Sequence, residues 1–293
     1  MDFLQLALDF LQLALNGIAV GSIIALAAVG LTLTYGILRL SNFAHGDFMT
    51  LGAYLTFAAN QQGLNIWLSM TLGIIMTVIA VLISEQLLWS PMRAKRASST
   101  TLIIISIGLA LFLRNGIILI WGSNNQRYDL PVPSAVSWLG LNITYNRLLV
   151  TGLAIVAIIA LHLLLKYTKI GKGMRAVADD VDLARVTGIN VDQVILWTWI
   201  IAGSLTALGG GMLGLVEAVR PNMGWFLILP MFASVILGGI GNPYGAIAGA
   251  FLIGIVQETS TLFLPTAYKQ GVALLIMVVV LLFRPQGLFK GMV

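Results

Sequence analysis

Six consecutive residues, 42 to 47, bring an amide, an imidazole and a carboxylate to the point where an apolar run begins. If that run spans a membrane, Asn42, His45 and Asp47 must face protein or a water-filled cavity, because lipid offers them no hydrogen bonds. His45 is a candidate for a pH-sensitive or substrate-facing group, although such a histidine more often caps a helix or bonds a neighbouring carbonyl. Asp47 is a candidate for binding an ammonium group, with completion of a helix start as the alternative role.

Titratable side chains also interrupt the interior of the long apolar runs. They are Glu85, Arg114, His162, Glu217 and Glu258. A charge at the centre of a membrane helix costs about 2.5 to 3.5 kcal/mol on insertion scales, so each is expected to have a partner. Arg114 and Glu258 lie at similar distances from the outer ends of their runs, which predicts a buried ion pair between them. The alternative is that Arg114 binds a substrate carboxylate, with Glu258 also on the substrate pathway.

A polar insert at about 168–193 separates two strongly apolar runs and gathers charge in a chain of which only 9% is charged. Residues at spacings of three and four predict one amphipathic helix, with its apolar or small stripe at Met174, Val177, Val181, Ala184 and Gly188. Asp182 lies on the charged face beside this stripe. We expect the stripe to dock on a soluble partner, because such residues fit a groove. The alternative is a solvated connector helix that lies on lipid head groups.

Glycines recur at four-residue spacing in several of the runs, which favours close packing of helices. The pairs and triplets are Gly17 and Gly21, Gly210 and Gly214, and Gly241, Gly245 and Gly249. Three consecutive glycines, 209 to 211, have a second predicted effect besides close packing. They predict a weakened span whose backbone, at Gly210, is exposed to a permeating solute.

The composition identifies the setting of all these residues. With 59% apolar residues and a mean hydropathy of +0.97, the chain cannot be a soluble globule without large exposed apolar patches. Its 293 residues leave room for roughly eight to ten spans of about 20 residues and no soluble domain. We therefore predict an all-α polytopic membrane bundle of about 8–10 helices, some of them short or broken, in a single domain that covers residues 1–293.

Nine apolar runs bounded by turn or charge signals are the predicted spans. They lie at about 10–38, 43–60, 66–89, 100–121, 147–167, 194–218, 225–240, 246–264 and 270–283. The heptad Asp2 to Leu8 is repeated as Asp9 to Leu15, so the helix from Phe3 to Leu38 would be roughly 54 Å long at 1.5 Å per residue. Its first heptad is expected to lie outside the hydrocarbon.

Positive charge gathers in three segments: Arg93 to Arg96, Lys166 to Arg185, and the tail with Arg284 and Lys290. With nine spans, all three fall on one side, which predicts a cytoplasmic C-terminus and an external N-terminus. Asp2, Asp9 and the segment 122–146, with Pro133, then lie outside. The net charge of +5 is explained by these loops and by anionic lipids, so we expect no nucleic-acid partner.

Several motifs of catalysis and nucleotide binding are missing from the sequence. Gly171-Lys172-Gly173 lacks the preceding glycine and the following Ser or Thr of a phosphate-binding loop. There is no His-Glu-x-x-His pair and no Gly-x-Ser-x-Gly elbow, and the chain has no cysteine. We therefore expect no enzyme activity and no bound cofactor, and an ATP-driven process would need its ATP and Mg²⁺ on another chain.

Four segments together resemble the branched-chain amino acid permease family (LivH type) of bacterial ABC importers. They are Asn42 to Asp47 followed by Leu51-Gly52-Ala53-Tyr54, then Asp182-Leu183-Ala184 with Gly188, then Gly238 to Gly245, and Arg284-Pro285-Gln286-Gly287-Leu288-Phe289. The second of these segments, Asp182-Leu183-Ala184 with Gly188, is an imperfect copy of the family's cytoplasmic loop signature, with Asp for Glu and Leu for Ala. The segments occur in the family's order along nearly the whole chain.

The resemblance implies a permease subunit in a bacterial inner membrane that moves branched-chain or other neutral amino acids inward. It also implies cytoplasmic ATPase subunits docked on the insert, a second homologous permease and a periplasmic binding protein. Two alternatives stay open: a secondary transporter or channel driven by an ion gradient, and an ABC permease for another small polar solute such as urea or a short amide.

Overall fold

The computed structural model describes residues 3–131, 134–138, 141–284 and 286–289. Asp2, Pro133, Pro285 and Lys290 lie outside the described residues. Each of the nine predicted runs coincides with a helix. The corresponding helices are α1 (Phe3–Leu38), α2 (His45–Gln61), α3 (Ile66–Ser84), α5 (Ser99–Trp121), α6 (Tyr145–Tyr167), α9 (Val191–Val216), α10 (Met223–Gly238), α11 (Pro243–Thr259) and α12 (Lys269–Phe283).

Seven of the described helical segments are long and apolar enough to cross a membrane. The helices α2 and α10, with 17 and 16 residues, are shorter than a full span. The prediction of an all-α polytopic membrane protein with some short helices is confirmed. The described residues add only one small sheet, a hairpin of β1 (Ala135–Trp138) and β2 (Leu141–Thr144) in which Ala135 pairs with Thr144.

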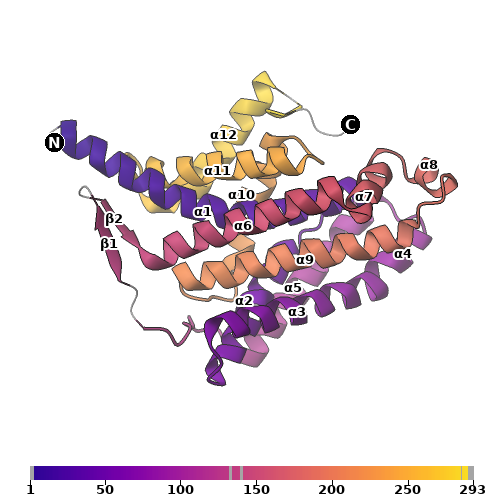
Figure 1. Cartoon of the computed structure of the whole chain (residues 1–293), viewed down its shortest axis with the longest axis horizontal. Helices are drawn as coiled ribbons and strands as arrows, with labels where there is room; N and C mark the ends of the chain where they lie inside the picture. Colours follow the sequence, from indigo (N-terminus) through magenta and orange to yellow (C-terminus); the bar gives the residue numbers. More distant parts are fainter. Residues whose placement is uncertain (1–2, 132–133, 139–140, 285, 290–293) are drawn as a thin grey trace.

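The long helices run side by side between two ends of the bundle (Figure 1). One end carries the polar insert, which forms α7 (Lys169–Asp179) and α8 (Val181–Val186), together with α4 (Ser90–Ala94). We call it the insert end. The opposite end carries the N-terminus and the hairpin and is called the hairpin end. The described part of the tail returns to the end of α10, where the Leu288 N–H donates to the Leu237 carbonyl.

Helix α1 is the element around which the others pack. It is continuous over 36 residues, or roughly 54 Å, and contacts α6, α9, α10 and α11. Its first turns extend to the hairpin, where Gln12 forms two hydrogen bonds with the backbone of Asn142, at 2.9 and 2.8 Å. The repeated heptad therefore lengthens one continuous helix as far as the hairpin.

The short helices α2 and α10 begin inside the bundle and not at its ends. His45, the first residue of α2, is hydrogen-bonded to Ala27 in the middle of α1 and to Thr206 in the middle of α9. The first turn of α10 meets the same region, because a Cβ at Gly224 would lie 1.7 Å from the Gly46 carbonyl oxygen. Both helices can start here because residues without side chains let the two backbones touch.

Most of the glycines at four-residue spacing pack helices together, as predicted, although Gly214 instead faces the Tyr128 side chain and Gly241 lies in the turn before α11. A Cβ at Gly17 would lie 2.5 Å from the Ile255 Cα of α11, and one at Gly21 would lie 3.0 Å from the Phe251 Cα. Gly210 does not loosen α9, which stays helical through all three consecutive glycines. Instead, a Cβ at Gly210 would lie 2.0 Å from the Met49 carbonyl oxygen, so the prediction of an unwound span was wrong. Tight packing against α2 holds this stretch in the helix.

A π-helix, η1 (Glu85–Trp89), separates α3 from α4 near the insert end. It aims Glu85 back into the bundle, where the Trp199 indole N–H donates to the carboxylate at 2.7 Å. Arg93 forms an ion pair with the same carboxylate, and the rings of Trp89 and Trp199 stack with centroids 6.4 Å apart. This cluster joins α3, α4 and α9.

The segment between α5 and β1 is fixed at the hairpin end by Tyr128. Its phenol donates to the Ala53 carbonyl at 3.3 Å and fills the space beside Gly214. Burial raises the pKa of Tyr128, so the phenol stays protonated and remains a donor.

The backbone contacts predict how the bundle responds to added methyl groups. Gly210→Ala should lower the free energy of unfolding by about 1 to 3 kcal/mol, because the new methyl group overlaps the Met49 carbonyl. Gly116→Ala in α5 is the matched control, since a Cβ there meets nothing within 4 Å of the described atoms. Thermal unfolding in detergent measures both variants, and equal midpoints for the two would contradict the packing.

Candidate functional site

A cavity of about 590 Å³ lies toward the hairpin end between α1, α9, α10, α11 and α12. The helices contribute the last turns of α9 and α11, the first turns of α10 and α12, and the middle of α1. Its lining consists of Val20, Ile23, Ile24, Leu213, Val216, Glu217, Arg220, Met223, Phe226, Leu227, Pro230, Gln257, Glu258, Thr266, Ala267, Lys269 and Gln270. Such a volume is typical of small-molecule sites, which span roughly 300 to 1,000 Å³.

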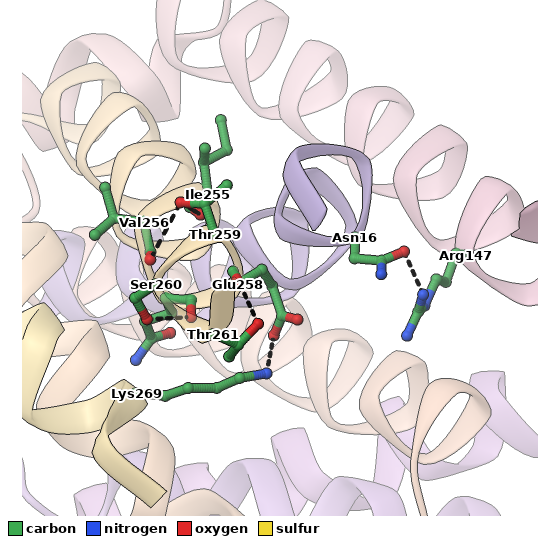
Figure 2. A network of polar contacts seen from close by, with 10 residues as sticks. Asn16, Arg147, Ile255, Val256, Glu258, Thr259, Ser260, Thr261 and Lys269 are labelled. Carbon is green, nitrogen blue, oxygen red and sulfur yellow. Dashed lines mark hydrogen bonds and ion pairs between the residues drawn. The ribbon is translucent and has the colours of Figure 1, made fainter. Parts of the chain in front are cut away.

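Two ion pairs line this cavity, one inside it and one where it meets solvent. The Lys269 Nζ donates to the Glu258 Oε1 at 2.6 Å, and the two side chains are only 29% and 14% exposed (Figure 2). The Arg220 Nη2 lies 3.7 Å from the Glu217 Oε2, and both side chains are about half exposed. The first pair joins α11 to α12, because Glu258 is near the end of one helix and Lys269 begins the next.

The remaining walls of the cavity are formed by apolar side chains together with the polar residues Gln257, Thr266 and Gln270. Ile23 and Ile24 on α1 are almost fully buried, and Leu213 on α9 faces the same space. On the far side of α1, Arg147 of α6 donates to Asn16, which ties α6 to α1 near this end (Figure 2). The cavity thus combines side chains of opposite charge with apolar surface.

The predicted ion pair between Arg114 and Glu258 is wrong, because each residue has another partner. Glu258 pairs with Lys269, while Arg114 donates from Nε and Nη2 to the two carboxylate oxygens of Asp47, at 3.0 and 3.1 Å. The helices that carry them have different neighbours, because α5 packs on α2, whereas α11 packs on α1, α10 and α12. Their similar distances from the outer ends of the apolar runs did not reveal which helices are neighbours in the bundle.

The pair of Asp47 and Arg114 sits where α2 and α10 begin. The Asp47 carboxylate is fully buried, and the Arg114 guanidinium lies 4.5 Å from the centre of the Trp225 ring in the first turn of α10. Two parallel hydrogen bonds and an aromatic face satisfy the arginine, which is the geometry that guanidinium favours. In this structure the Asp47 carboxylate is therefore engaged by a protein cation.

His45 and Asn42 are also enclosed by protein. The His45 Nε2 lies 2.9 Å from the Ala27 carbonyl oxygen and 2.8 Å from the Thr206 Oγ1, an arrangement close to the structural role considered for it above. The Asn42 Oδ1 accepts a hydrogen bond from the Ala44 N–H at 3.1 Å, just before α2. Its buried Nδ2 has no hydrogen-bond partner among the described residues.

All five interrupting groups have polar partners, as predicted. Besides the pairs above, the His162 Nδ1 lies 2.9 Å from the Tyr244 hydroxyl, and the Glu85 carboxylate holds Arg93 and Trp199. Lys269 and Trp225 are the site residues that the sequence analysis missed. Lys269 follows Glu258 by 11 positions across a turn, so a search for opposite charges that flank a short inter-span turn finds this pair.

The insert forms two helices, so the prediction of one amphipathic helix was wrong. Asp180 adopts an extended conformation with φ −152° and ψ 114°, and its side chain caps α8 by accepting from the N–H groups of Asp182 and Leu183. The break divides the predicted stripe. Met174 and Val177 on α7 pack into the bundle, at 2% and 1% exposed, and so face their own chain.

Helix α8 turns the rest of the predicted stripe in another direction. Ala184 is buried at 3% exposed, and Gly188 ends the helix with φ +87°. The exposed apolar residues of α8 are Val181, Leu183 and Val186, at 37%, 60% and 80% exposed. We call these three residues the α8 tip. Asp182 projects beside them with its side chain almost entirely in solvent.

Comparisons with known proteins agree over nearly the whole chain. The family described as the permease component of branched-chain amino acid transport systems matches residues 13–281. The chain is similar to the high-affinity branched-chain amino acid permease LivH of Escherichia coli K12, with 33% identity over 96% of each chain. It is also 30% identical to BraD of Pseudomonas aeruginosa over 95% of each chain, and 30% identical to a probable LivH of Methanocaldococcus jannaschii. No solved structure matches the chain.

The buried ion pair of Asp47 and Arg114 predicts a large energetic coupling between α2 and α5. Asp47→Asn should lower the free energy of unfolding by about 3 to 5 kcal/mol, because it leaves the Arg114 guanidinium without its counter-charge. Adding Arg114→Met should recover much of this loss. A double-mutant cycle on thermal unfolding measures the coupling, with the half-exposed Glu217 and Arg220 as a control pair expected to couple by less than about 1 kcal/mol. Strictly additive effects at Asp47 and Arg114 would contradict the contact.

Proposed function

The chain belongs to the family of permease components of branched-chain amino acid transport systems, and from this premise we propose that it moves branched-chain or other neutral amino acids into the cytoplasm. The match over nearly the full length is the observation that carries the proposal. Seven long apolar helices among the described residues make the chain a multi-pass membrane protein, and its relatives are permease proteins of transport systems. The chain acts as a non-catalytic subunit of an ABC importer.

ATP and Mg²⁺ bind on separate ATPase subunits in this proposal. The chain lacks a phosphate-binding loop, so ATP hydrolysis must occur on another polypeptide. A second homologous permease completes the path, and a periplasmic binding protein delivers the amino acid. Membership of the permease family supports these partners as a class.

The α8 tip is the surface that we assign to the ATPase, with Asp182 beside it. Val181, Leu183 and Val186 are apolar yet exposed at an end of the bundle that is otherwise rich in charge, and apolar residues on a short helix suit a groove in a soluble partner. Gly188 and Ala184 shape α8, and neither presents a side chain to the partner. Met174 and Val177 then transmit movement of the insert to the bundle.

Contacts of α7 with α6 support that transmission. Arg175 donates to the Leu165 carbonyl, and a Cβ at Gly171 would lie 2.3 Å from the same oxygen. The insert is thus packed against the end of α6 and does not hang from a loose loop. A push on α8 would move α6 and α9 together, because short connections join both helices to the insert.

The charges favour an orientation with the insert end in the cytoplasm. Arg93, Lys95 and Arg96 lie at the same end as the insert, and the tail that follows Arg284 returns there. Positive loops are retained on the cytoplasmic side, which places the N-terminus and the hairpin outside. The cavity then opens toward the side from which a binding protein would deliver substrate.

Reconstituted vesicles test the energy source and the α8 tip together. Leucine uptake by the complete complex should require ATP, and uptake by this chain alone under an ion gradient would favour a secondary transporter. Leu183→Ser should reduce ATP-driven uptake and co-purification of the ATPase by about tenfold, the equivalent of 1.4 kcal/mol, because it removes an apolar contact.

The matched control is Leu4→Ser, a leucine on α1 at the opposite end that is 72% exposed against 60% for Leu183, and this variant should leave uptake unchanged. Full coupling in the Leu183 variant would rule out the α8 tip as the docking surface. ATP-driven uptake of urea or a short amide, with none of leucine, would instead replace the substrate class.

A further inference from the structure

The charges in the cavity at the hairpin end cancel in adjacent pairs. Glu258 is paired with Lys269 inside the cavity, and Glu217 with Arg220 at its mouth. A site for a simple cation or anion carries an excess of the opposite charge. Two balanced pairs suit a solute that carries both signs and no net charge, because each end of the solute finds its complement.

We propose that Glu258 and Lys269 bind the zwitterionic head of a free aliphatic amino acid, with the ammonium group on Glu258 and the carboxylate on Lys269. The proposal rests on the proposed function and names the permease residues that recognise the substrate. In an α-amino acid the two charged groups are attached to the same carbon atom, so an adjacent acid and base can contact both of them at once.

The burial of the pair strengthens its attraction for such a head group. The two side chains are 14% and 29% exposed, so the charges are less screened than those of a surface pair. Lys269 has a flexible stem and three donor hydrogens, and it can retain one hydrogen bond to Glu258 while it binds a carboxylate. Binding of the head group therefore requires only that the Glu258 and Lys269 side chains exchange some of their hydrogen bonds, and no new charge has to form in the cavity.

The walls of the cavity determine which side chain can accompany the head group. Val20, Val216 and Leu227 present aliphatic surface over the buried Ile23 and Ile24, and Phe226 adds an aromatic ring. A polar side chain placed here loses its hydrogen bonds with water and gains none from these residues. An aliphatic side chain gains by leaving water, so the cavity favours branched or straight aliphatic amino acids.

Gln270 and Arg220 extend the polar surface toward the mouth. The Gln270 Nε2 already donates to the Phe226 carbonyl at 3.0 Å, and Arg220 is about half exposed beside Glu217. These groups stay hydrated and are screened by salt, so they guide a dipolar solute inward without fixing it. The inner pair provides the specific contacts.

The absence of cysteine from the sequence allows a direct test by thiol labelling. Ala267→Cys places an exposed thiol on the lining of the cavity, and Ser123→Cys places one on the segment after α5, outside the lining. The variants are purified as the assembled complex with the partner permease and ATPases, without ATP or binding protein. A small charged methanethiosulfonate reagent is applied, and labelling is followed on this chain.

Leucine at ten times its dissociation constant should slow labelling of Ala267→Cys about tenfold and leave Ser123→Cys unchanged. Leucinamide, which lacks the carboxylate, and 4-methylpentanoate, which lacks the ammonium group, should each protect far less at the same concentration. Equal protection by leucine and either analogue, or no protection by leucine, would overturn the proposal. This arm leaves the ion pair intact and does not depend on the folding of a charge variant.

A second arm separates recognition from a purely structural ion pair. Glu258→Gln combined with Lys269→Gln removes both charges without stranding either, so the fold should persist while protection by leucine is lost. Asp129→Asn, an exposed acid outside the cavity lining, is the matched control and should retain full protection. Full protection in the double variant would show that the pair only joins α11 to α12, and it would also overturn the proposal.

ATP-driven leucine uptake by the same complexes distinguishes this proposal from the proposed function. Uptake that persists while leucine fails to protect Ala267→Cys would overturn the binding site alone. Loss of all ATP-driven amino acid uptake in the parent complex would overturn the proposed function, whatever the labelling shows.

Discussion

The contact between the backbones of Gly46 and Gly224 is the constraint on which the interior of this bundle depends. Two helices can begin within the membrane only if their first N–H groups and neighbouring polar side chains find partners in protein, because lipid supplies none. The touching backbones bring Thr50 within 3.0 Å of the Gly224 N–H and place Trp225 beside Arg114. Asp47 then receives the guanidinium, and the α2 start is fixed against α1 and α9. A side chain at either glycine would separate all of these groups together.

The sequence predicted the helices well and their neighbours poorly. Apolar runs mark spans because every span must be apolar and satisfy its own backbone, which is a one-dimensional property. The place of Arg114 within its apolar run predicted that it needs a polar partner, but it did not identify that partner. Asp47 is 67 residues away, on a helix that only tertiary packing brings beside Arg114. The break between α7 and α8 is indicated locally by Asp180, because aspartate is a favoured helix N-cap residue. The spacing of apolar residues did not indicate it, because that spacing continues unchanged through Asp180. Glycine spacing likewise indicated close packing but not which backbone would be touched.

The two ends of the bundle differ in how firmly their polar elements are held. At the insert end, α7 is packed on α6 through Gly171 and Arg175, and Glu85 connects three helical segments. At the hairpin end, the cavity is closed on one side by α12, which packs on α10 and α11, is joined to α11 by the pair of Glu258 and Lys269, and has Ala273 as the only fully buried residue among those described in it. The insert end is therefore held by many contacts, whereas the wall of the cavity at the hairpin end is held by fewer. This difference suits a protein in which a partner pushes on one end and a solute enters at the other.

The π-helix at Glu85–Trp89 has a consequence for how the sequence of this protein can vary. A π turn contains one residue more than an α turn, so every residue after it is rotated by about 100° relative to an uninterrupted helix. Arg93 and Trp89 reach their partners only with that extra residue in place. Substitutions in the turn preserve the rotation, whereas loss of a single residue would swing both side chains out toward lipid. Deletion of one residue from this segment is therefore expected to disturb the contacts of Trp89 and Arg93 more than most single substitutions within it.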